Sequence, residues 1–104
     1  MFRVVRVQYT ATPEFVPQNK ANIAKVMADL REINNPGLKY ATFLDADGVS
    51  FMHFAMFENE EATNVLNSLE SFKHFQAELK ANVPGVAPKT EKMTLVASGY
   101  EIFV

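Results

Sequence analysis

The spacing of apolar residues along the chain predicts four β-strands and two helices. Residues 2–10 alternate β-branched or aromatic residues with polar ones, which is typical of a half-buried strand. In residues 17–33 apolar side chains recur every three or four positions, the spacing of one helix face. The apolar positions of this helix are Ile23, Val26, Met27, Leu30 and Ile33. The Asn-Asn-Pro-Gly sequence of residues 34–37 predicts its end, because asparagine and glycine tolerate left-handed backbone angles and proline cannot continue a helix.

A β-hairpin is predicted next, with strands over residues 39–45 and 49–57 and an Asp-Gly turn at residues 47–48. Asp-Gly is among the strongest short-range signals for such a turn. With these two residues at the centre of the turn, Thr42 lies opposite His53 on the neighbouring strand.

A second helix is predicted over residues 58–82, beginning with acidic residues that stabilise the first turn of a helix. Ser68 and Ser71 mark a position where this helix can break. Residues 90–104 predict a final strand, with a bend or bulge at the Ser-Gly pair of residues 98–99.

The order β-α-β-β-α-β predicts a single α+β domain over residues 1–104 with the ferredoxin-like arrangement, two helices covering one face of a four-stranded antiparallel sheet. Alternation along the strands divides their apolar residues between the two faces. The residues predicted to face the helices are Val5, Val7, Tyr9, Ala41, Phe43, Met52, Phe54, Met56, Met93 and Leu95. The apolar residues predicted on the opposite face are Val4, Tyr40, Leu44, Phe51, Phe57 and Val96.

That opposite face is largely apolar, and the sequence predicts no further helix to cover it. An exposed apolar face is unusual on a soluble monomer, and the same face of a second copy is its simplest cover. We therefore expect a homodimer that forms through the sheet faces. Phe51 and Phe57 are expected as dimer contacts or as residues that stack on an aromatic ligand.

The chain carries ten basic and twelve acidic residues, for a formal net charge of −2, and no cysteine. Its lysines are scattered, whereas nucleic-acid binding needs clustered positive charge. The chain has no apolar run near the roughly 20 residues that span a bilayer, and its N-terminus lacks a signal-peptide pattern. We expect a cytoplasmic protein with no nucleic-acid or membrane partner. Phosphate-loop, nucleophile-elbow and metal-ligand motifs are also missing, so we expect no cofactor and no metal.

Several polar side chains are predicted among the apolar residues of the opposite face, a composition typical of small-molecule pockets. They are Arg6, Gln8, Tyr40, Thr42, His53, Thr94 and Ser98. His53 is the candidate catalytic base, because an imidazole near its ordinary pKa can take a proton from an acidic carbon or a phenol. Arg6 is a candidate for holding a carboxylate or developing negative charge, and Tyr40 for donating to the same oxygen.

Structural interpretations stand beside these roles. A histidine next to Thr42 on a sheet is more often a hydrogen-bonded interface residue than a base, and Arg6 can equally form an ion pair across a dimer. His74 lies within one helical turn of Glu70 and Glu78, which favours a solvated, ion-paired face. The other interpretation places His74 at the pocket rim or as a haem ligand.

The element order, the two-faced strands and residues 71–77 (Ser-Phe-Lys-His-Phe-Gln-Ala) together resemble the dimeric α/β-barrel superfamily over nearly the whole chain. The nearest branch is the antibiotic-biosynthesis-monooxygenase-like domains. The resemblance implies a dimer whose sheets enclose pockets, with members that range from cofactor-independent oxygenases and haem-degrading enzymes to proteins without known activity. The chain has no tryptophan, which these enzymes generally use in the pocket, and Gln76 stands where the haem-degrading branch has histidine. No catalytic residue is transferred from the family.

Two functions remain open from the sequence. The first is binding of a small apolar or aromatic ligand, with cofactor-independent monooxygenase-like activity on an aromatic or polyketide-like compound and His53 as base or hydrogen-bond partner. The second is a non-catalytic homodimeric module whose polar residues only satisfy one another. A cavity of several hundred cubic ångströms favours the first, and a filled interface favours the second.

Overall fold

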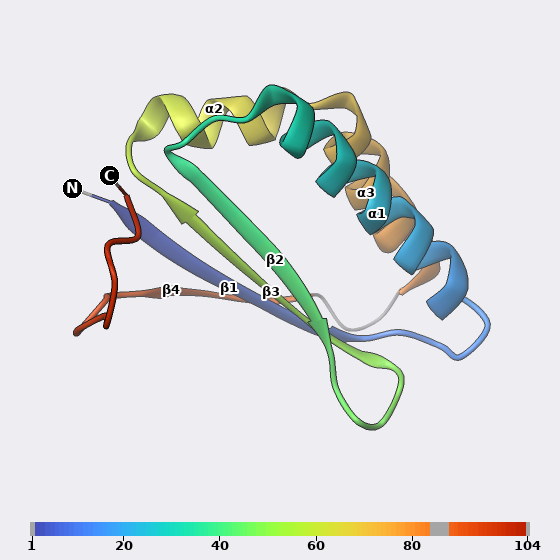
Figure 1. The fold of residues 1–104 in the computed structure, drawn as a ribbon. Helices are drawn as coiled ribbons and strands as arrows, with labels where there is room; N and C mark the ends of the chain where they lie inside the picture. The colour runs from blue at the N-terminus through green and yellow to red at the C-terminus, as the bar shows by residue number, and fades with distance from the viewer. Residues whose placement is uncertain (1, 84–87, 104) are drawn as a thin grey trace.

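The computed structural model describes residues 2–83 and 88–103 (Figure 1). Within them the elements are β1 (Arg3–Thr10), α1 (Val16–Ile33), β2 (Leu38–Leu44), β3 (Ser50–Phe57), α2 (Glu60–Ser68), α3 (Glu70–Asn82) and β4 (Lys89–Met93). The strands form one antiparallel sheet in the order β2-β3-β1-β4. The helices of the described residues all lie on one side of it (Figure 1). The predicted α+β ferredoxin-like fold is confirmed.

The helices begin and end for local reasons that the sequence carries. Asn34 adopts the left-handed conformation at φ 52° and ends α1, with its N–H donating to the Leu30 carbonyl. The predicted second helix is two helices, because Leu69 is extended between α2 and α3, in the interval where the two serines predicted a break. The Asn59 side chain caps α2 by accepting a hydrogen bond from the Ala62 N–H. None of the helices in the described residues has the length and apolar character needed to cross a membrane.

The hairpin has the predicted pairing but a different turn. Thr42 lies opposite His53, as expected. The turn runs from Asp45 to Gly48, whose N–H donates to the Asp45 carbonyl at 3.0 Å, so Gly48 closes the turn instead of lying at its centre. Gly48 has φ 78°, a conformation that glycine adopts without steric cost.

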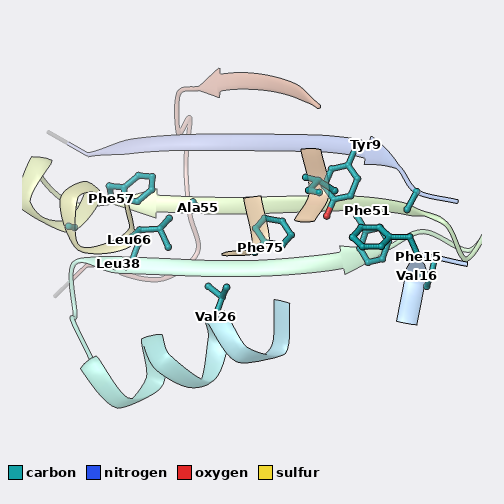
Figure 2. Packing of buried hydrophobic residues seen from close by; sticks show 13 residues of the cluster. Tyr9, Phe15, Val16, Val26, Leu38, Phe51, Ala55, Phe57, Leu66 and Phe75 are labelled. Carbon is teal, nitrogen blue, oxygen red and sulfur yellow. The ribbon is translucent and has the colours of Figure 1, made fainter. Parts of the chain in front are cut away.

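The two faces of the hairpin are exchanged relative to the prediction. Phe51 and Phe57, expected on the face away from the helices, are 3% and 5% exposed in the core on the helix side (Figure 2). The residues predicted to face the helices but found on the uncovered face are Ala41, Phe43, Met52, Phe54 and Met56. Both sets are almost equally apolar, so alternation determined which residues share a face but not which face turns to the helices.

On β1, β2 and β4 the predicted sheet faces are correct for some residues and wrong for others. The β1 residues that share the helix-covered face, as predicted, are Val5, Val7 and Tyr9, opposite Ala55, His53 and Phe51 of β3. Tyr40 and Leu44 of β2, expected on the other face, lie on the helix-covered side too. Val4 is on the uncovered face as predicted, and its partner there is Met93, which was expected in the helix-side core.

The last strand is shorter than the sequence predicted. After β4, residues 94–103 leave the sheet, and Val104 lies outside the described residues. Leu95, expected in the core, is 39% exposed in this segment. Phe103 packs edge to face on Phe2 with ring centroids 5.2 Å apart, so the segment returns to the start of β1 (Figure 1).

Candidate functional site

His53 lies in the middle of β3, with a strand on either side. Its partners across the sheet are Val7 on β1 and Thr42 on β2. The imidazole is on the helix-covered face, where its ring centroid is 5.3 Å from that of Phe75 on α3. Because only 3% of the residue is exposed, its polar atoms depend on partners within the protein.

Both ring nitrogens of His53 have such partners. The Nε2 atom lies 2.7 Å from the Tyr9 hydroxyl, and Nδ1 lies 2.8 Å from the Tyr40 hydroxyl and 2.9 Å from the Thr42 hydroxyl. The Tyr9 hydroxyl also accepts a hydrogen bond from Asn19 Nδ2 at 2.9 Å. Three strands and α1 thus contribute to one buried polar network, which includes the bond to Thr42 that the strand pairing predicted.

Burial keeps this network uncharged at neutral pH. Desolvation lowers the pKa of His53 from 6.5 to about 4, so the imidazole is neutral. Desolvation raises the pKa of Tyr9 to about 12, against a smaller lowering by the hydrogen bond from Asn19. It also raises the pKa of Tyr40, with the hydrogen bond to Thr42 acting in the opposite direction. At pH 7 the network is a set of neutral donors and acceptors.

A cavity of about 710 Å³ lies above this network, between the sheet and α3. Its lining residues are Val7, Tyr9, Tyr40, His53, Phe72, Phe75, Gln76, Leu79, Lys80, Val83, Pro88 and Thr90. The Phe72 ring meets that of Tyr40 edge to face at 6.2 Å, so aromatic side chains form both the floor and one wall. A mostly apolar cavity of this size with a few grouped polar atoms has the character of a small-molecule site.

Several residues predicted for this pocket lie elsewhere. Arg6 and Gln8 are on the uncovered face of β1, and Arg6 forms an ion pair with Glu91 of the adjacent strand β4. Thr94 and Ser98 are exposed in the segment that leaves the sheet. Arg6 and Gln8 thus keep the face predicted for them, and the exchange of the hairpin faces is the physical reason that His53 does not lie beside them. The early end of β4 is the reason that Thr94 and Ser98 leave the sheet.

The other predicted ligand contacts divide in the same way. Phe51 and Phe57 belong to the core; Phe51 stacks on Tyr9 at 5.5 Å instead of facing a dimer partner. Tyr40, Thr42 and His53 come together as predicted, although on the helix-covered face.

The exposure of His74 decides between its two predicted positions, on a solvated face or at the rim of the pocket. His74 is exposed on α3, and no carboxylate of the described residues lies within ion-pair distance of it. Glu70 pairs instead with Lys73 at 3.7 Å. Gln76, two residues further along α3, is the side chain of this segment that lines the cavity. The solvated face is therefore correct and its ion pairing is not.

The sequence analysis missed Asn19 and the α3 wall of the cavity. Asn19 is fully buried, at 0% exposure, and precedes Ile23 by four residues and Val26 by seven. It therefore continues the apolar stripe of α1, and a polar residue at such a position signals a buried hydrogen-bond partner. The α3 wall follows from its apolar stripe only once the hairpin faces are known. Across residues 2–83 and 88–103, no group of three or more metal-ligating side chains gathers.

No protein-family model and no curated protein sequence matches the chain. Solved structures match it closely in shape. Rv0793 from Mycobacterium tuberculosis has a TM-score of 0.78 at 12% identity, covering 96% of this chain and 100% of that one. A variant of SnoaB, a cofactor-independent oxygenase from Streptomyces nogalater, has a TM-score of 0.71 at 14% identity, covering 96% and 98%. An antibiotic biosynthesis monooxygenase has a TM-score of 0.70 at 16% identity, covering 93% and 100%.

This chain has the α+β ferredoxin-like fold of these structures. The family resemblance suggested by the sequence is confirmed at the level of the fold, over almost the full length of each of these chains. Identities this low establish the fold and leave activity to be argued from the site.

Proposed function

We propose that this protein binds a small aromatic or polyketide-like compound in the cavity under α3 and oxygenates it without a cofactor. The observation that carries the proposal is the cavity of about 710 Å³ whose floor is the neutral Tyr9–His53–Tyr40 network. The volume suits a drug-sized ligand, and the aromatic walls suit a flat one. The cofactor-independent oxygenase among the structural neighbours supports the reaction type.

In this proposal Tyr40 is the residue that touches the ligand and His53 supports it. Tyr40 lines the cavity, and its hydroxyl is hydrogen-bonded to His53 Nδ1. A hydroxyl held in this way stabilises negative charge that develops on a ligand oxygen when a carbon conjugated with it loses its proton to water. Of the two roles predicted for His53, hydrogen-bond partner fits better than base, because a group with a pKa of about 4 takes protons weakly at neutral pH.

The reaction proposed converts an acidic CH₂ group, conjugated with a ketone through aromatic rings, into a second ketone. One CH₂ and one O₂ give one C=O and one H₂O, so the substrate supplies all four electrons and no other reductant is needed. Anthrone, a flat tricyclic compound with such a group, is a suitable probe. We expect the protein to raise the rates of O₂ consumption and anthraquinone formation above the uncatalysed background, in a ratio of one to one.

The matched variants are Tyr40→Phe, which keeps the aromatic wall and removes the hydroxyl, and Lys73→Ala, an exposed change outside the cavity lining. We expect Tyr40→Phe to lower the catalysed rate by about 10²-fold or more, as removal of one stabilising donor does in other enzymes. Lys73→Ala should leave it unchanged. Binding of anthrone without any catalysed oxidation would limit the function to binding.

A non-catalytic module is the second candidate, because the polar groups of the network bind one another. His53 uses both nitrogens within the protein. If this bonding is their whole role, anthrone and similar flat compounds will not bind, and His53→Gln will alter stability alone. Isothermal titration with anthrone separates the two candidates.

We also propose that the uncovered face of the sheet pairs with the same face of a second copy. The support is its apolar character: Phe43 is 56% exposed there, and its ring meets that of Phe54 at 6.2 Å. Phe54→Asp should convert a dimer to a monomer in analytical ultracentrifugation, because a charge would be buried at the two-fold contact. Asn67→Asp, an exposed change on α2, is the matched control. A Phe54→Asp protein that remained dimeric would contradict this arrangement.

A further inference from the structure

The polar network has a direction, which begins at Asn19. The Asn19 side chain is completely buried, and its Nδ2 donates to the Tyr9 hydroxyl. Its Oδ1 has no hydrogen-bond partner within the described residues. The opposite orientation of the amide would leave N–H groups unpaired instead, and buried unpaired donors are rarer in proteins than buried unpaired acceptors. The amide therefore presents a donor to Tyr9.

The single hydrogen of the Tyr9 hydroxyl then has one acceptor among the described side chains. The hydroxyl oxygen accepts from Asn19, and its remaining neighbour in the described residues is His53 Nε2, at 2.7 Å. A buried hydroxyl hydrogen without an acceptor would give up its hydrogen bond to water and gain none in return. Tyr9 therefore donates to Nε2, and Nε2 carries no hydrogen.

Because Nε2 of His53 carries no hydrogen, the protonation of Nδ1 follows. A neutral imidazole carries one hydrogen, so in His53 it is on Nδ1. That N–H points to the hydroxyls of Tyr40 and Thr42, at 2.8 and 2.9 Å. Both hydroxyls are then acceptors toward His53. The hydrogen bond between Thr42 and Tyr40 lowers the pKa of Tyr40, as a bond donated to the phenol oxygen does, so Thr42 is its donor and the hydrogen of Tyr40 remains for another partner. Tyr40 lines the cavity.

We propose that Asn19, acting through Tyr9 and His53, fixes the direction of a hydrogen-bond chain that ends in a donor facing the cavity. Asn19 is a positioning residue, since it is absent from the cavity lining. The ligand that matches the donor is a flat aromatic compound with an acceptor oxygen, either a carbonyl or a phenolate. A ligand that presents an N–H at this point would leave two donors facing each other. The ligand class rests on the proposed function; the direction of the chain does not.

The tautomer of His53 in the ligand-free protein tests the direction. Long-range ¹H–¹⁵N correlation spectra distinguish a protonated ring nitrogen from an unprotonated one by a large difference in chemical shift. The chain has two histidines, and exposed His74 provides the reference pattern. We expect hydrogen on Nδ1 of His53 near pH 7. Hydrogen on Nε2 would overturn the proposal.

Two buried asparagines of α1 provide a matched pair of variants. Asn19→Leu removes the donor to Tyr9 and should shift the His53 tautomer toward Nε2–H. Asn22→Leu changes a residue that is 6% exposed and bonded to Gln18, and it should leave the tautomer unchanged. If Asn19→Leu fails to fold, Tyr9→Phe removes the next donor in the chain and should have the same effect. An unchanged tautomer in a folded variant would show that Asn19 does not set the direction.

Three flat tricyclic compounds of similar size test the ligand class. Fluorenone presents a carbonyl acceptor, carbazole presents an N–H donor, and fluorene presents neither. In isothermal titration we expect fluorenone to bind about tenfold more tightly than fluorene, and carbazole no more tightly than fluorene. Tyr40→Phe should abolish the preference for fluorenone without reducing fluorene binding.

Binding of the three compounds distinguishes an error in the inferred donor from an error in the ligand class and the proposed function. If carbazole binds as tightly as fluorenone, the inferred donor is wrong although the binding cavity stands. If none of the three binds, the ligand class and the proposed function both fail, and the tautomer measurement still decides the direction of the chain.

Discussion

The two faces of the sheet carry similar amounts of apolar side chain but hold their polar groups differently. On the helix-covered face, His53, Tyr9 and Tyr40 form a buried neutral network. On the uncovered face, Arg6 and Glu91 keep opposite charges, with side chains 29% and 36% exposed. Burial without compensation penalises the charged form of a group, whereas partial exposure to water preserves it. The helices therefore determine which chemistry each face can support.

A second difference between the faces is where space remains. The helix-covered face holds a partly open cavity beneath α3, which Phe72 and Phe75 line on the side opposite the network. The uncovered face has Phe43 and Phe54 in contact with each other and, within the described residues, no helix above them. We therefore propose the ligand pocket for the first face and the interface between copies for the second.

The largest expected effect is on stability, where a phenylalanine from each face can be compared. Phe51→Ala should lower the free energy of unfolding by about 3–5 kcal/mol, because it removes a fully buried ring. Phe43→Ala, on the uncovered face, should cost much less at low protein concentration, where pairing between copies contributes little. Urea denaturation of both variants measures the difference. Equal losses would mean that both faces are covered equally well within one chain.

The next effect is the pH dependence of stability on the covered face. The pKa of His53 is about 4 in the folded protein and 6.5 when exposed, so the unfolded chain binds the proton more strongly between these values. Stability is therefore fully present above about pH 6.5 and is lost as the pH falls toward 4, by about 3 kcal/mol in total.

His53→Gln is the control, because it cannot titrate. Urea denaturation at pH 7 and pH 4.5 should show a much smaller loss for this variant than for the natural protein. If the two proteins lost stability in parallel, the acid sensitivity would come from the carboxylates and the imidazole would not be buried as described.

The smallest effect is expected from the ion pair of the uncovered face. Arg6 lowers the pKa of the Glu91 carboxyl by hydrogen bonding, yet a part-exposed pair contributes little to stability because water screens it. Glu91→Gln should shift the thermal midpoint slightly at low salt and leave it unchanged in 1 M NaCl. A large, salt-independent loss would indicate that this pair is buried within the interface between copies instead of lying at its rim.

The sequence was sufficient for the element order, the register of the hairpin and the meeting of Tyr40, Thr42 and His53. These follow from short-range signals: helical spacing, turn residues and alternation. The assignment of faces did not follow, because Met52 and Phe54 are as apolar as Phe51 and Ala55. Only the packing of α1 and α3 on one side distinguishes them.

The candidate site was less accessible to prediction than the fold. Arg6 was predicted beside His53 because both were placed on the same face, and the structure separates them by the thickness of the sheet. Asn19 was passed over as a polar residue at the edge of an apolar stripe. Its partner Tyr9 was correctly predicted in the core, but the bond between them joins α1 to β1 and depends on tertiary packing.

The measurement that tests the central claim most directly is a methyl NMR titration of the full chain with fluorenone. The account predicts chemical-shift changes at the methyl groups of Val7 and Leu79, which line the cavity, while those of Met52 and Met56 on the uncovered face stay constant. Shifts confined to Met52 and Met56 would place the ligand on the wrong face of the sheet and contradict the account.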